Sequence, residues 1–382
     1  MKAIIAGGGI GGLAAALALQ RSGVEVSVLE RRTELSKVAA GAGLMVWHNG
    51  TSALERLGVG DAVTSRSTPI DRFEFRTWRG APLACWQVGE LGRELGAPTV
   101  GINRADLHVA LAGALQPGVL RLGEACTGFR QDDDGVTVQL AGGGAERADL
   151  LIGADGINSA VRTQLLGARA PRYAGYTTWR GVLDFPDEDA PPGLARKLWG
   201  PGRRFLSYRI GDGRLYWLAL ARAAEGGSDP EGGARAAVLA EYRGWDGPVE
   251  AMIDATDESV IARVDIADHA PLRRWGEGRV TLLGDAAHAM TPNKGQGACQ
   301  AIEDAVVISR ELEGALDVPG ALRRYEDARR KRTAGFQRES RMIGSLGRWR
   351  TGVACGVRDR LIRASFEGMG QRRHELEMRT AP

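Results

Sequence analysis

The stretch Lys2-Ala-Ile-Ile-Ala-Gly-Gly-Gly-Ile-Gly-Gly-Leu13 decides the fold of this chain. A short apolar strand runs into a Gly-x-Gly-x-x-Gly turn, and an Ala- and Leu-rich helix is expected from Leu13 to Ser22. A second strand then ends at Glu30, 18 residues past Gly12. In such a unit the glycines let a pyrophosphate approach the backbone, and the acid accepts hydrogen bonds from a ribose hydroxyl. The stretch therefore predicts an α/β fold that binds a dinucleotide.

A second stretch, residues 279–305, predicts the other end of the same site. Val280 to Leu283 is an apolar run that ends in Gly284-Asp285, and ligands bind at the carboxyl end of buried parallel strands. A Gly-Gln-Gly-Ala loop then opens a helix, whose first N–H groups attract an anion or an electron-rich carbonyl. We therefore expect a cofactor seat formed by Asp285, Pro292, Gly295, Gln296, Gly297 and Ala298.

The composition is ordinary for a globular chain of two domains, with 382 residues, 43% hydrophobic and 25% charged. A net charge of +3, spread along the chain, does not favour nucleic acid as a partner. The four cysteines form no CxxC pair and His48 has no partner at metal spacing, so we expect neither disulfides nor a metal, and a reducing cytoplasm. The glycine turn explains the uncharged run from Ala3 to Gln20 better than a signal peptide does, and no other stretch suits a membrane span.

Three further sites have open readings. Asp155, in Gly-Ala-Asp-Gly after another apolar strand, either binds ribityl or ribose hydroxyls or anchors its turn, and Ser159 caps the helix that follows. Arg104, at the start of a helix, either reaches a phosphate or flavin edge or is solvated. The glycine run Gly41 to Gly43 either lets the backbone approach a cofactor ring or forms a surface loop.

The remaining patterns divide the chain into sheet and helix. We expect a β-hairpin over Ile70 to Val88 and an antiparallel meander that includes Val119 to Cys126 and Gly135 to Leu140. Residues 173–269 read as a mostly antiparallel sheet that lines a substrate pocket, in which core packing explains at least half of the tryptophans Trp179, Trp199, Trp217 and Trp245. Residues 338–382 hold ten arginines and five acids, which favours solvated faces of packed helices over a membrane-surface or partner helix.

Taken together, the Gly-x-Gly-x-x-Gly turn with Glu30, the turn at Asp155, and Gly284-Asp285-Ala-Ala-His with Pro292 and Gly-Gln-Gly resemble a known set. This motif set resembles that of the class A, single-component FAD-dependent monooxygenases of the aromatic-hydroxylase type. Within that class the chain looks most like the bacterial urate hydroxylases, the salicylate hydroxylases and the zeaxanthin epoxidase-like members. The resemblance covers nearly the whole chain. It implies a Rossmann-like FAD-binding domain of the glutathione-reductase type with an inserted, mostly antiparallel substrate domain and C-terminal helices. The implied ranges are 1–70, 100–172 and 270–340 for the FAD domain, 71–99 and 173–269 for the substrate domain, and 341–382 for the helices.

The resemblance also implies which residues hold FAD. Glu30 would bind the adenosine ribose, Cys126 the adenine through its backbone, Arg104 the phosphate or ribityl region, and Asp285 the ribityl chain. The loop before the last large helix would hold the pyrimidine edge of the flavin ring, where amide N–H groups stabilise the negative charge of the reduced ring. The full set of expected FAD residues is Gly9, Gly11, Gly12, Glu30, Arg31, Arg104, Cys126, Asp155, Asp285, Pro292, Gly295, Gln296, Gly297 and Ala298.

The implied activity is hydroxylation of an aromatic or heteroaromatic small molecule with NADH or NADPH and O₂, through a flavin C4a-hydroperoxide, in a monomer or homodimer. Arg204 would orient the substrate, Tyr216 would hydrogen-bond with it, and Asn293 would contact it near the flavin. Asn293 and Lys294 stand where urate hydroxylases carry an acid and an apolar residue. Three alternatives remain: epoxidation or oxidative tailoring of a polyketide, terpenoid or indole-type substrate, a flavin dehydrogenase or reductase without oxygen chemistry, and a non-catalytic FAD-binding protein.

Overall fold

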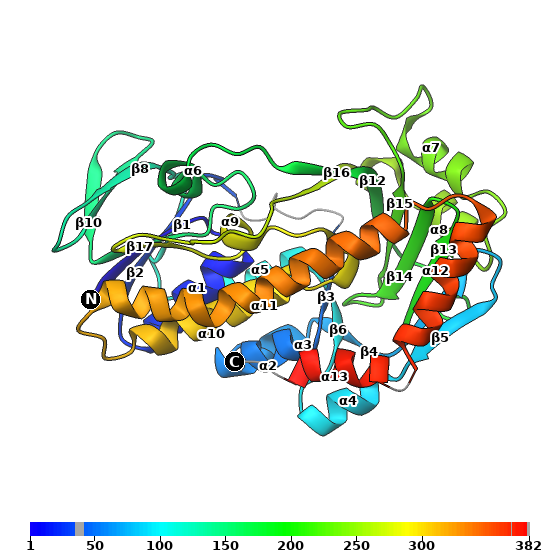
Figure 1. Cartoon of the computed structure of the whole chain (residues 1–382), viewed down its shortest axis with the longest axis horizontal. Helices are drawn as coiled ribbons and strands as arrows, with labels where there is room; N and C mark the ends of the chain where they lie inside the picture. The colour runs from blue at the N-terminus through cyan, green and yellow to red at the C-terminus, as the bar shows by residue number, and fades with distance from the viewer. Residues whose placement is uncertain (35–41, 368, 380–382) are drawn as a thin grey trace.

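The computed structural model describes residues 1–34, 42–367 and 369–379; Gly41, the first residue of the predicted glycine run, lies outside them. One end of the molecule is built on a five-stranded parallel sheet in the order β17-β11-β1-β2-β7 (Figure 1). The residues of β1, β11 and β17 are almost all buried, as expected for a parallel sheet covered on both faces. The strands are β1 (Lys2–Ala6), β2 (Glu25–Glu30), β7 (Leu120–Leu122), β11 (Leu150–Gly153) and β17 (Val280–Leu282).

The predicted meander was wrong at its first strand. The meander consists of β8 (Cys126–Gln131), β9 (Val136–Leu140) and β10 (Ala145–Ala148), whereas β7 joins the parallel sheet beside β2. The backbone N–H of Val28 donates to the carbonyl of Val119 at 2.8 Å, so this segment covers the edge of β2 that would otherwise be open. Gly123 has a φ of 76° and separates β7 from β8 with a turn. Alternating residues indicated a strand here but not which sheet it would join.

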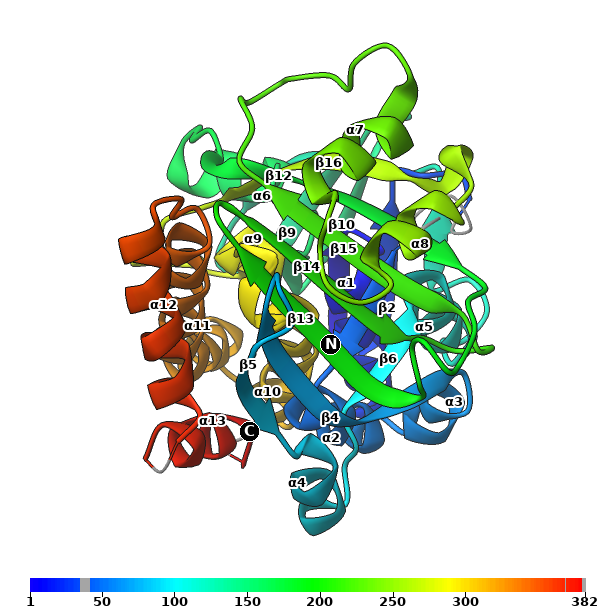
Figure 2. The ribbon, with the colours of Figure 1, turned by 90° about the vertical axis from the view of Figure 1, so that its right-hand side faces the viewer.

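The second sheet has nine strands and lies in front of the first in the view of Figure 2. Its order is β16-β12-β15-β14-β13-β4-β6-β3, with β5 paired to β4, and all neighbours are antiparallel except β13 and β4. It is therefore mostly antiparallel, as predicted, although β3 and β6 come from ranges assigned to the FAD domain. The strands are β3 (Gly43–Val46), β4 (Ser67–Thr77), β5 (Pro82–Trp86), β6 (Val100–Asn103), β12 (Arg172–Leu183), β13 (Gly193–Gly200), β14 (Arg203–Arg209), β15 (Leu215–Ala221) and β16 (Ala262–Asp268).

The two faces of the large sheet have different roles. Alternation along β14 and β15 turns Phe205 and Trp217 to the outer face, where α7 (Gly233–Tyr242) and α8 (Val249–Asp254) cover them. Trp179 and Trp245 belong to the same buried cluster and Trp199 belongs to the other one, so all four tryptophans are core residues, in line with the prediction that at least half would be. Burial of each large side chain contributes about 1.5–3 kcal/mol. The opposite face carries Leu206 and Leu218 and looks toward the parallel sheet.

Helices join the two sheets. The helix α1 (Ile10–Arg21) starts three residues earlier than predicted and packs on α10 (Gly297–Leu312), and α11 (Val318–Leu346) runs along both sheets (Figure 1). Near the C-terminus, α12 (Gly352–Ser365) lies against β5, and α13 (Met369–Arg379) lies near the N-terminal segment α2 (His48–Arg56). The other helices used below are α4 (Val88–Leu95), α5 (Arg104–Gly113), α6 (Ala160–Leu166) and α9 (Asp285–His288).

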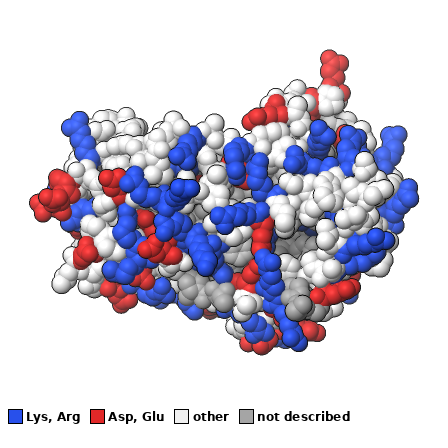
Figure 3. All heavy atoms as spheres, viewed as in Figure 1, with Lys and Arg blue, Asp and Glu red and all other residues white. Residues whose placement is uncertain are grey.

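Charges of both signs are interspersed over the face on which α11 lies, in keeping with the small net charge (Figure 3). Many of the arginines there pair with neighbouring acids: Arg324 lies 3.1 Å from Glu311, and Arg330 lies 2.6 Å from Asp327. In the part of the chain that the structure describes, no helix is both long and apolar enough to cross a membrane.

Candidate functional site

A cavity of about 340 Å³ lies between the two sheets. One wall comes from the parallel sheet and the starts of α1, α5 and α10, and the other from the inner face of the large sheet. The carboxyl ends of β1, β11 and β17 point to it, which is where ligands bind in such sheets. Eight of the predicted FAD residues line the cavity: Gly9, Gly11, Arg104, Asp285, Pro292, Gly295, Gly297 and Ala298.

The glycine turn leaves room for a ligand at one position and none at the others. A Cβ atom at Gly12 would lie 1.9 Å from the carbonyl oxygen of Gly7, and one at Gly11 would lie 2.8 Å from a side-chain carbon of Leu283. A Cβ atom at Gly9 would meet nothing within 4 Å, although Gly9 is the N-cap of α1 and has no side chain to cap it. The first N–H groups of α1 are therefore open to a ligand.

The start of α10 is similarly open. Its N-cap, Gln296, makes no capping hydrogen bond from its side chain, and Gly297 and Ala298 line the cavity. A Cβ atom at Gly295 would lie 2.9 Å from the indole nitrogen of Trp47, and that nitrogen is buried without a hydrogen-bond partner among the described residues. Two positive helix ends thus meet at one cavity, an arrangement that attracts negative charge at both ends.

Arg104 is partly buried at the start of α5, with its Nε atom fully shielded from solvent. It lines the cavity, and its Nε has no hydrogen-bond partner in the described part of the chain. Burial lowers the pKa of Arg104, and the negative charge of Asp285 partly offsets this effect. A cation with a shielded polar atom needs an anionic or strongly polar partner. Together with the two open helix ends, Arg104 fits a ligand with a pyrophosphate and an electron-rich ring, which are the two polar parts of FAD.

Other predicted FAD residues lie outside the cavity wall. The carboxylate of Glu30 accepts hydrogen bonds from the backbone of Gly8 at 2.8 Å and of Arg32 at 2.9 Å, so it fixes the glycine turn. Gly12 lies within α1, and Arg31 is exposed. These positions lie on or beside the glycine turn, away from the inner face of the large sheet.

Asp155 anchors its turn, one of its two predicted readings. Its Oδ2 accepts from the backbone N–H of Ala160 at 2.7 Å, and Ser159 caps α6 as expected. The other oxygen, Oδ1, is buried without a partner among the residues described. Cys126 begins β8, with its thiol near the carbonyl of Gly128. Gln296 is buried and hydrogen-bonds with Asn49, so its side chain supports the start of α10 from behind.

Tyr216 lines the cavity on the wall formed by the large sheet. Its ring packs edge-on against Tyr208, with centroids 5.3 Å apart. A Cβ atom at Gly43 would lie 2.4 Å from the Tyr216 ring, which explains a glycine in β3 at this point. Burial raises the pKa of Tyr216 to about 12, so the phenol stays protonated and can donate a hydrogen bond. Phe73 and Leu206 extend this wall, which is mostly apolar.

Asn293 lines the cavity, whereas Arg204 lies behind it. The side-chain oxygen of Asn293 accepts from Arg204, and its amide nitrogen lies 2.8 Å from the Tyr176 hydroxyl and 2.8 Å from the Ser340 carbonyl. Arg204 is 2% exposed, and its guanidinium lies 5.4 Å from the centroid of the Trp199 ring. An amide can both accept from Arg204 and donate to a carbonyl, which a carboxylate cannot do. Arg204 therefore reaches the cavity through Asn293.

Lys294 connects the loop after α9 to two C-terminal helices. Its ammonium lies 2.5 Å from Glu339 of α11 and 2.7 Å from Glu377 of α13. Burial opposes ionisation of Glu377, but His374 and Lys294 outweigh it and lower the pKa of Glu377 to about 2. An apolar residue at this position would leave both acids without this partner.

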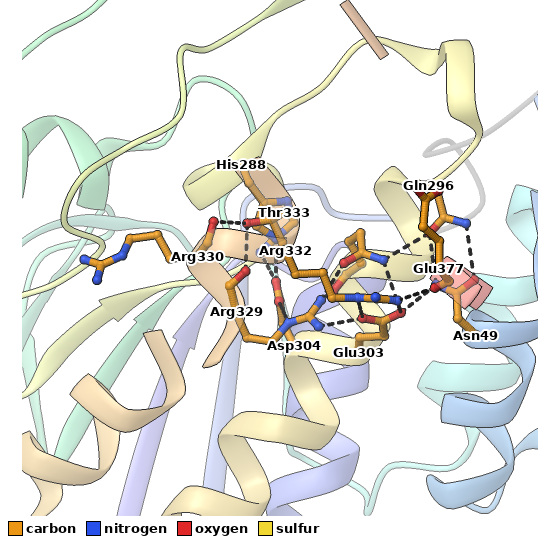
Figure 4. Close-up of polar contacts among 12 residues, drawn as sticks. Asn49, His288, Gln296, Glu303, Asp304, Arg329, Arg330, Arg332, Thr333 and Glu377 are labelled. Atoms are coloured by element: carbon orange, nitrogen blue, oxygen red, sulfur yellow. Dashed lines mark hydrogen bonds and ion pairs between the residues drawn. The ribbon is translucent and has the colours of Figure 1, made fainter. Parts of the chain in front are cut away.

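The loop is further supported by a buried polar network under α10 (Figure 4). Asp304 lies 2.6 Å from Nε2 of His288 and 2.7 Å from Nε of Arg329, which also donates to Glu303 at 2.5 Å. Burial opposes ionisation of Asp304, but His288 and Arg329 lower its pKa. Asn49 donates to Glu303 at 2.6 Å and so ties α2 to the same network. Side chains from α2, α9, α10 and α11 thus hold the start of α10 in place.

Sequence patterns did not reveal all the residues on the large-sheet wall of the cavity. Lys197, Phe73, Tyr208 and Trp47 all line it and were not predicted as site residues. The available signal was a lysine followed by Leu-Trp within a short strand, in a chain that has only five lysines. The aromatic residues carried no signal of their own, because the cavity forms only when distant strands pair.

The FAD binding domain family matches residues 1–340 of the chain. The chain belongs to this family. This flavoprotein is 43% identical over 364 residues to an aurachin C monooxygenase/isomerase from Stigmatella aurantiaca, over 95% of this chain and 94% of that protein. It is 36% identical over 331 residues to an FAD-dependent urate hydroxylase from Klebsiella pneumoniae subsp. pneumoniae, over 86% of each.

The flavoprotein also matches the crystal structure of Klebsiella pneumoniae HpxO complexed with FAD and uric acid. The TM-score is 0.91 at 32% identity, over 100% of this chain and 96% of the other. These similarities confirm the predicted fold class, the FAD cofactor and the resemblance to the FAD-dependent monooxygenases. The chain is therefore an oxidoreductase of that type.

Proposed function

We propose that this flavoprotein uses NADH or NADPH and O₂ to hydroxylate an aromatic or heteroaromatic small molecule. The observation that supports the proposal is the asymmetry of the cavity: open helix ends and Arg104 on one wall, and Tyr208, Tyr216 and Phe73 on the other. FAD, when bound, would accept a hydride and activate O₂. The relatives named as a urate hydroxylase and a monooxygenase/isomerase act in the same general class.

In this proposal the residues of the chain bind FAD, orient the substrate and shield the reaction from water. The start of α1 would hold the pyrophosphate of FAD, Arg104 would neutralise a phosphate or a ribityl oxygen, and the first N–H groups of α10 would face the electron-rich edge of the flavin ring. Tyr216 donates a hydrogen bond to the substrate, and Asn293, held by Arg204, contacts the substrate near the flavin. The apolar wall excludes water, which strengthens these interactions.

A substrate screen tests the proposal. Phenolic, purine and indole-like compounds are added to the FAD-loaded protein, and the oxidation of NADH and NADPH is followed together with the peroxide that is released. Stimulated consumption without matching peroxide, and a product that is one oxygen heavier, supports the proposal. Consumption that no compound stimulates, or a reaction that proceeds equally without O₂, contradicts it and favours a dehydrogenase or reductase.

A second candidate is an oxidation coupled to rearrangement, and the 43% identity to a protein named monooxygenase/isomerase favours it. In such a reaction the oxygenated product would leave the site with a changed skeleton. The same screen separates the two, because mass spectrometry gives one added oxygen in either case and NMR of the product shows whether the carbon skeleton has moved.

We also propose that the protein works in a reducing cytoplasm as a monomer or homodimer. Four free cysteines support the reducing compartment: Cys85, Cys126, Cys299 and Cys355. Size-exclusion chromatography with light scattering distinguishes the two oligomeric states.

A further inference from the structure

Lys197 lies on the substrate wall of the cavity, in the middle of β13. It is opposite Leu206 of β14 and Phe75 of β4. Leu206 lines the same cavity, and Trp199 follows Lys197 by two residues, so all three side chains share the inner face of the sheet. Lys197 is 7% exposed. A lysine held so far from solvent, with its side chain on the wall of a cavity, needs a polar partner.

The described residues do not supply a negative partner for this amine. No carboxylate of the described ranges forms a salt bridge with Lys197; its Nζ lies 3.4 Å from the backbone oxygen of Asn293 and 5.2 Å from the centroid of the Trp199 ring. The charged groups around it are cations. Arg204 of β14 and Arg358 of α12 both contact the Trp199 ring, which Lys197 also contacts. Arg358 itself pairs with Asp359, 2.8 Å away.

The other ionisable groups near the amine do not change this picture. Lys294, on the loop beside Asn293, is paired with Glu339 and Glu377. Tyr208 and Tyr216 face the cavity from β14 and β15. Burial, reinforced by the positive charge of Arg204, lowers the pKa of Lys197 to about 7. A substantial fraction of Lys197 is therefore a neutral amine near neutral pH, with a lone pair that can accept a proton.

We propose that Lys197 is a catalytic base that takes the proton of a ring hydroxyl and then holds the ring oxyanion as an ammonium. The step breaks the substrate O–H bond, forms an N–H bond on Nζ and leaves the electron pair on oxygen, so it consumes no oxidant or reductant. The substrate class is a hydroxyarene, that is, a phenol or a hydroxylated heteroaromatic ring. The inference rests on the proposed function, and it names the group that makes the ring electron-rich before oxygen transfer.

Other groups on this wall are less suited to the step. Burial raises the pKa values of Tyr208 and Tyr216, so both remain protonated and cannot accept a proton. Asn293 is an amide whose polar atoms are already engaged. Asp285 lies on the opposite wall, at the end of β17. After proton transfer, the oxyanion faces Lys197 with Arg204 behind it, and both positive charges stabilise it.

4-Nitrophenol tests the proposal, because its anion absorbs visible light and its neutral form does not. The FAD-loaded protein is titrated with 4-nitrophenol from pH 5 to pH 9, and binding is followed in parallel by calorimetry. In the unchanged protein we expect the bound phenol to ionise about tenfold more readily than in water, a shift of about one pH unit. In Lys197→Met this advantage is lost, while in the matched control Lys331→Met, an exposed lysine on α11, it is kept.

Lys197→Arg separates proton acceptance from charge. In a weakly buffered solution at about pH 8, 2-naphthol is neutral in water and Lys197 is mostly a neutral amine, so the amine keeps the phenol proton, whereas the permanently charged arginine holds the anion and releases a proton to the buffer. Unchanged ionisation in Lys197→Met overturns the proposal, and so does equal proton release in Lys197→Arg and the unchanged protein. Failure of 4-nitrophenol, 2-naphthol and 4-hydroxyquinoline to bind at all overturns it too. These readouts need neither NAD(P)H nor O₂, so they stand apart from the test of the proposed function.

Discussion

Asn293 joins four structural elements through one side-chain amide. It accepts from Arg204 of β14, and its nitrogen lies within hydrogen-bonding distance of Tyr176, Thr291 and Ser340. Arg204 already has a buried Nε without a partner among the described residues. The arginine is therefore held mainly by one oxygen atom and by the rings beside it.

Loss of that oxygen is expected to destabilise the protein. Asn293→Ala leaves the buried guanidinium of Arg204 short of an acceptor and should lower the free energy of unfolding by about 2–3 kcal/mol. Asn293→Asp keeps an acceptor for Arg204 but gives up the donor to the Ser340 carbonyl, so its loss should be smaller. Urea unfolding of both variants measures the difference. Equal losses would show that the Arg204 contact contributes little.

Gly9 and Gly12 are glycines for different reasons, and alanine substitution separates them. A Cβ at Gly9 meets only open space, so Gly9→Ala should keep the thermal stability of the FAD-free protein while weakening FAD binding about tenfold or more, because the ligand approaches there. A Cβ at Gly12 collides with the carbonyl of Gly7, so Gly12→Ala should disturb the fold itself. Flavin fluorescence measures FAD binding, and circular dichroism measures stability. Full FAD affinity in Gly9→Ala would contradict the assigned position of the pyrophosphate.

Single residues were predictable from sequence only where their role is local. The glycine turn and the Gly284-Asp285 pair lie in short strand-to-helix connections, so their spacing sufficed to predict the cavity wall. Lys197 and Arg204 depend on the register between β13 and β14, which local sequence does not encode. For that reason Arg204 was expected at the substrate and lies behind Asn293, while Lys197 was not singled out.

At the scale of elements, α10 and α11 are joined by buried charges rather than by apolar contacts alone. Arg329 of α11 contacts both Glu303 and Asp304 of α10, and all three are almost completely buried. An intact buried ion pair adds little to the net folding free energy. Removal of one member is strongly destabilising, because the other charge is then left buried without a partner.

Removal of Arg329 tests this coupling. Arg329→Met should lower the free energy of unfolding by about 3–5 kcal/mol, since Glu303 and Asp304 lose their shared partner. The matched control is Arg330→Met, the next residue on the same helix, which pairs at the surface with Asp327; its loss should be below about 1 kcal/mol. Guanidinium unfolding compares the two. Similar losses in both variants would mean that the network of Figure 4 is not the tie between these helices.

Elements with strong local signals were predicted well, and paired edges were not. The helix after Ser159 was expected from its cap, and α6 begins directly after that residue. The segment at residues 120–122 was expected in the meander and instead covers the edge of β2. That pairing depends on the open backbone edge of β2, which lies about 90 residues earlier in the chain. The local sequence around residues 120–122 therefore does not reveal it.

At the scale of the whole molecule, α13 contacts the loop that lines the cavity before α10. Glu377 of α13 pairs with Lys294, the sulfur of Met378 lies 3.4 Å from Nε2 of Gln296, and Arg379 reaches Glu94 of α4 at 2.5 Å. The last described helix thus contacts the loop that begins α10. We expected residues 338–382 to form solvated faces of packed helices, and the exposed arginines of α13 agree with this. The inner side of α13, however, helps to support the cavity.

This docking should depend on pH. The folded pKa of Glu377 is about 2, below the value of about 4.3 in an unfolded chain, so its contribution is fully present above pH 4.3 and is lost as pH falls toward 2. Lys294→Met removes one of the groups that depress this pKa and should raise amide exchange in α13 even at neutral pH. Hydrogen exchange with mass spectrometry between pH 3 and pH 7 measures both effects, with Lys331→Met as the control. Unchanged exchange in Lys294→Met would contradict the assigned role.

The division into domains remains a proposal at this scale. Sequence reasoning expected residues 71–99 and 173–269 to form the substrate domain, and most strands of the large sheet do come from these ranges. The sheet also takes β3 and β6 from the ranges given to FAD binding, because β4 continues directly into pairing with β6. Contacts of this kind cross any boundary that is drawn along the sequence.

The order of strands in the parallel sheet has a consequence for synthesis of the chain. The strand β11 needs β17 on its outer edge, yet more than a hundred residues separate them, and five of the nine strands of the large sheet, β12 to β16, are translated in between. During translation the edge of β11 is therefore left without its partner until residues 280–282 leave the ribosome. An open edge of this kind can pair with another nascent chain. We expect the yield of folded protein to rise when translation is slowed by low temperature or when chaperones that shield unpaired strands are supplied.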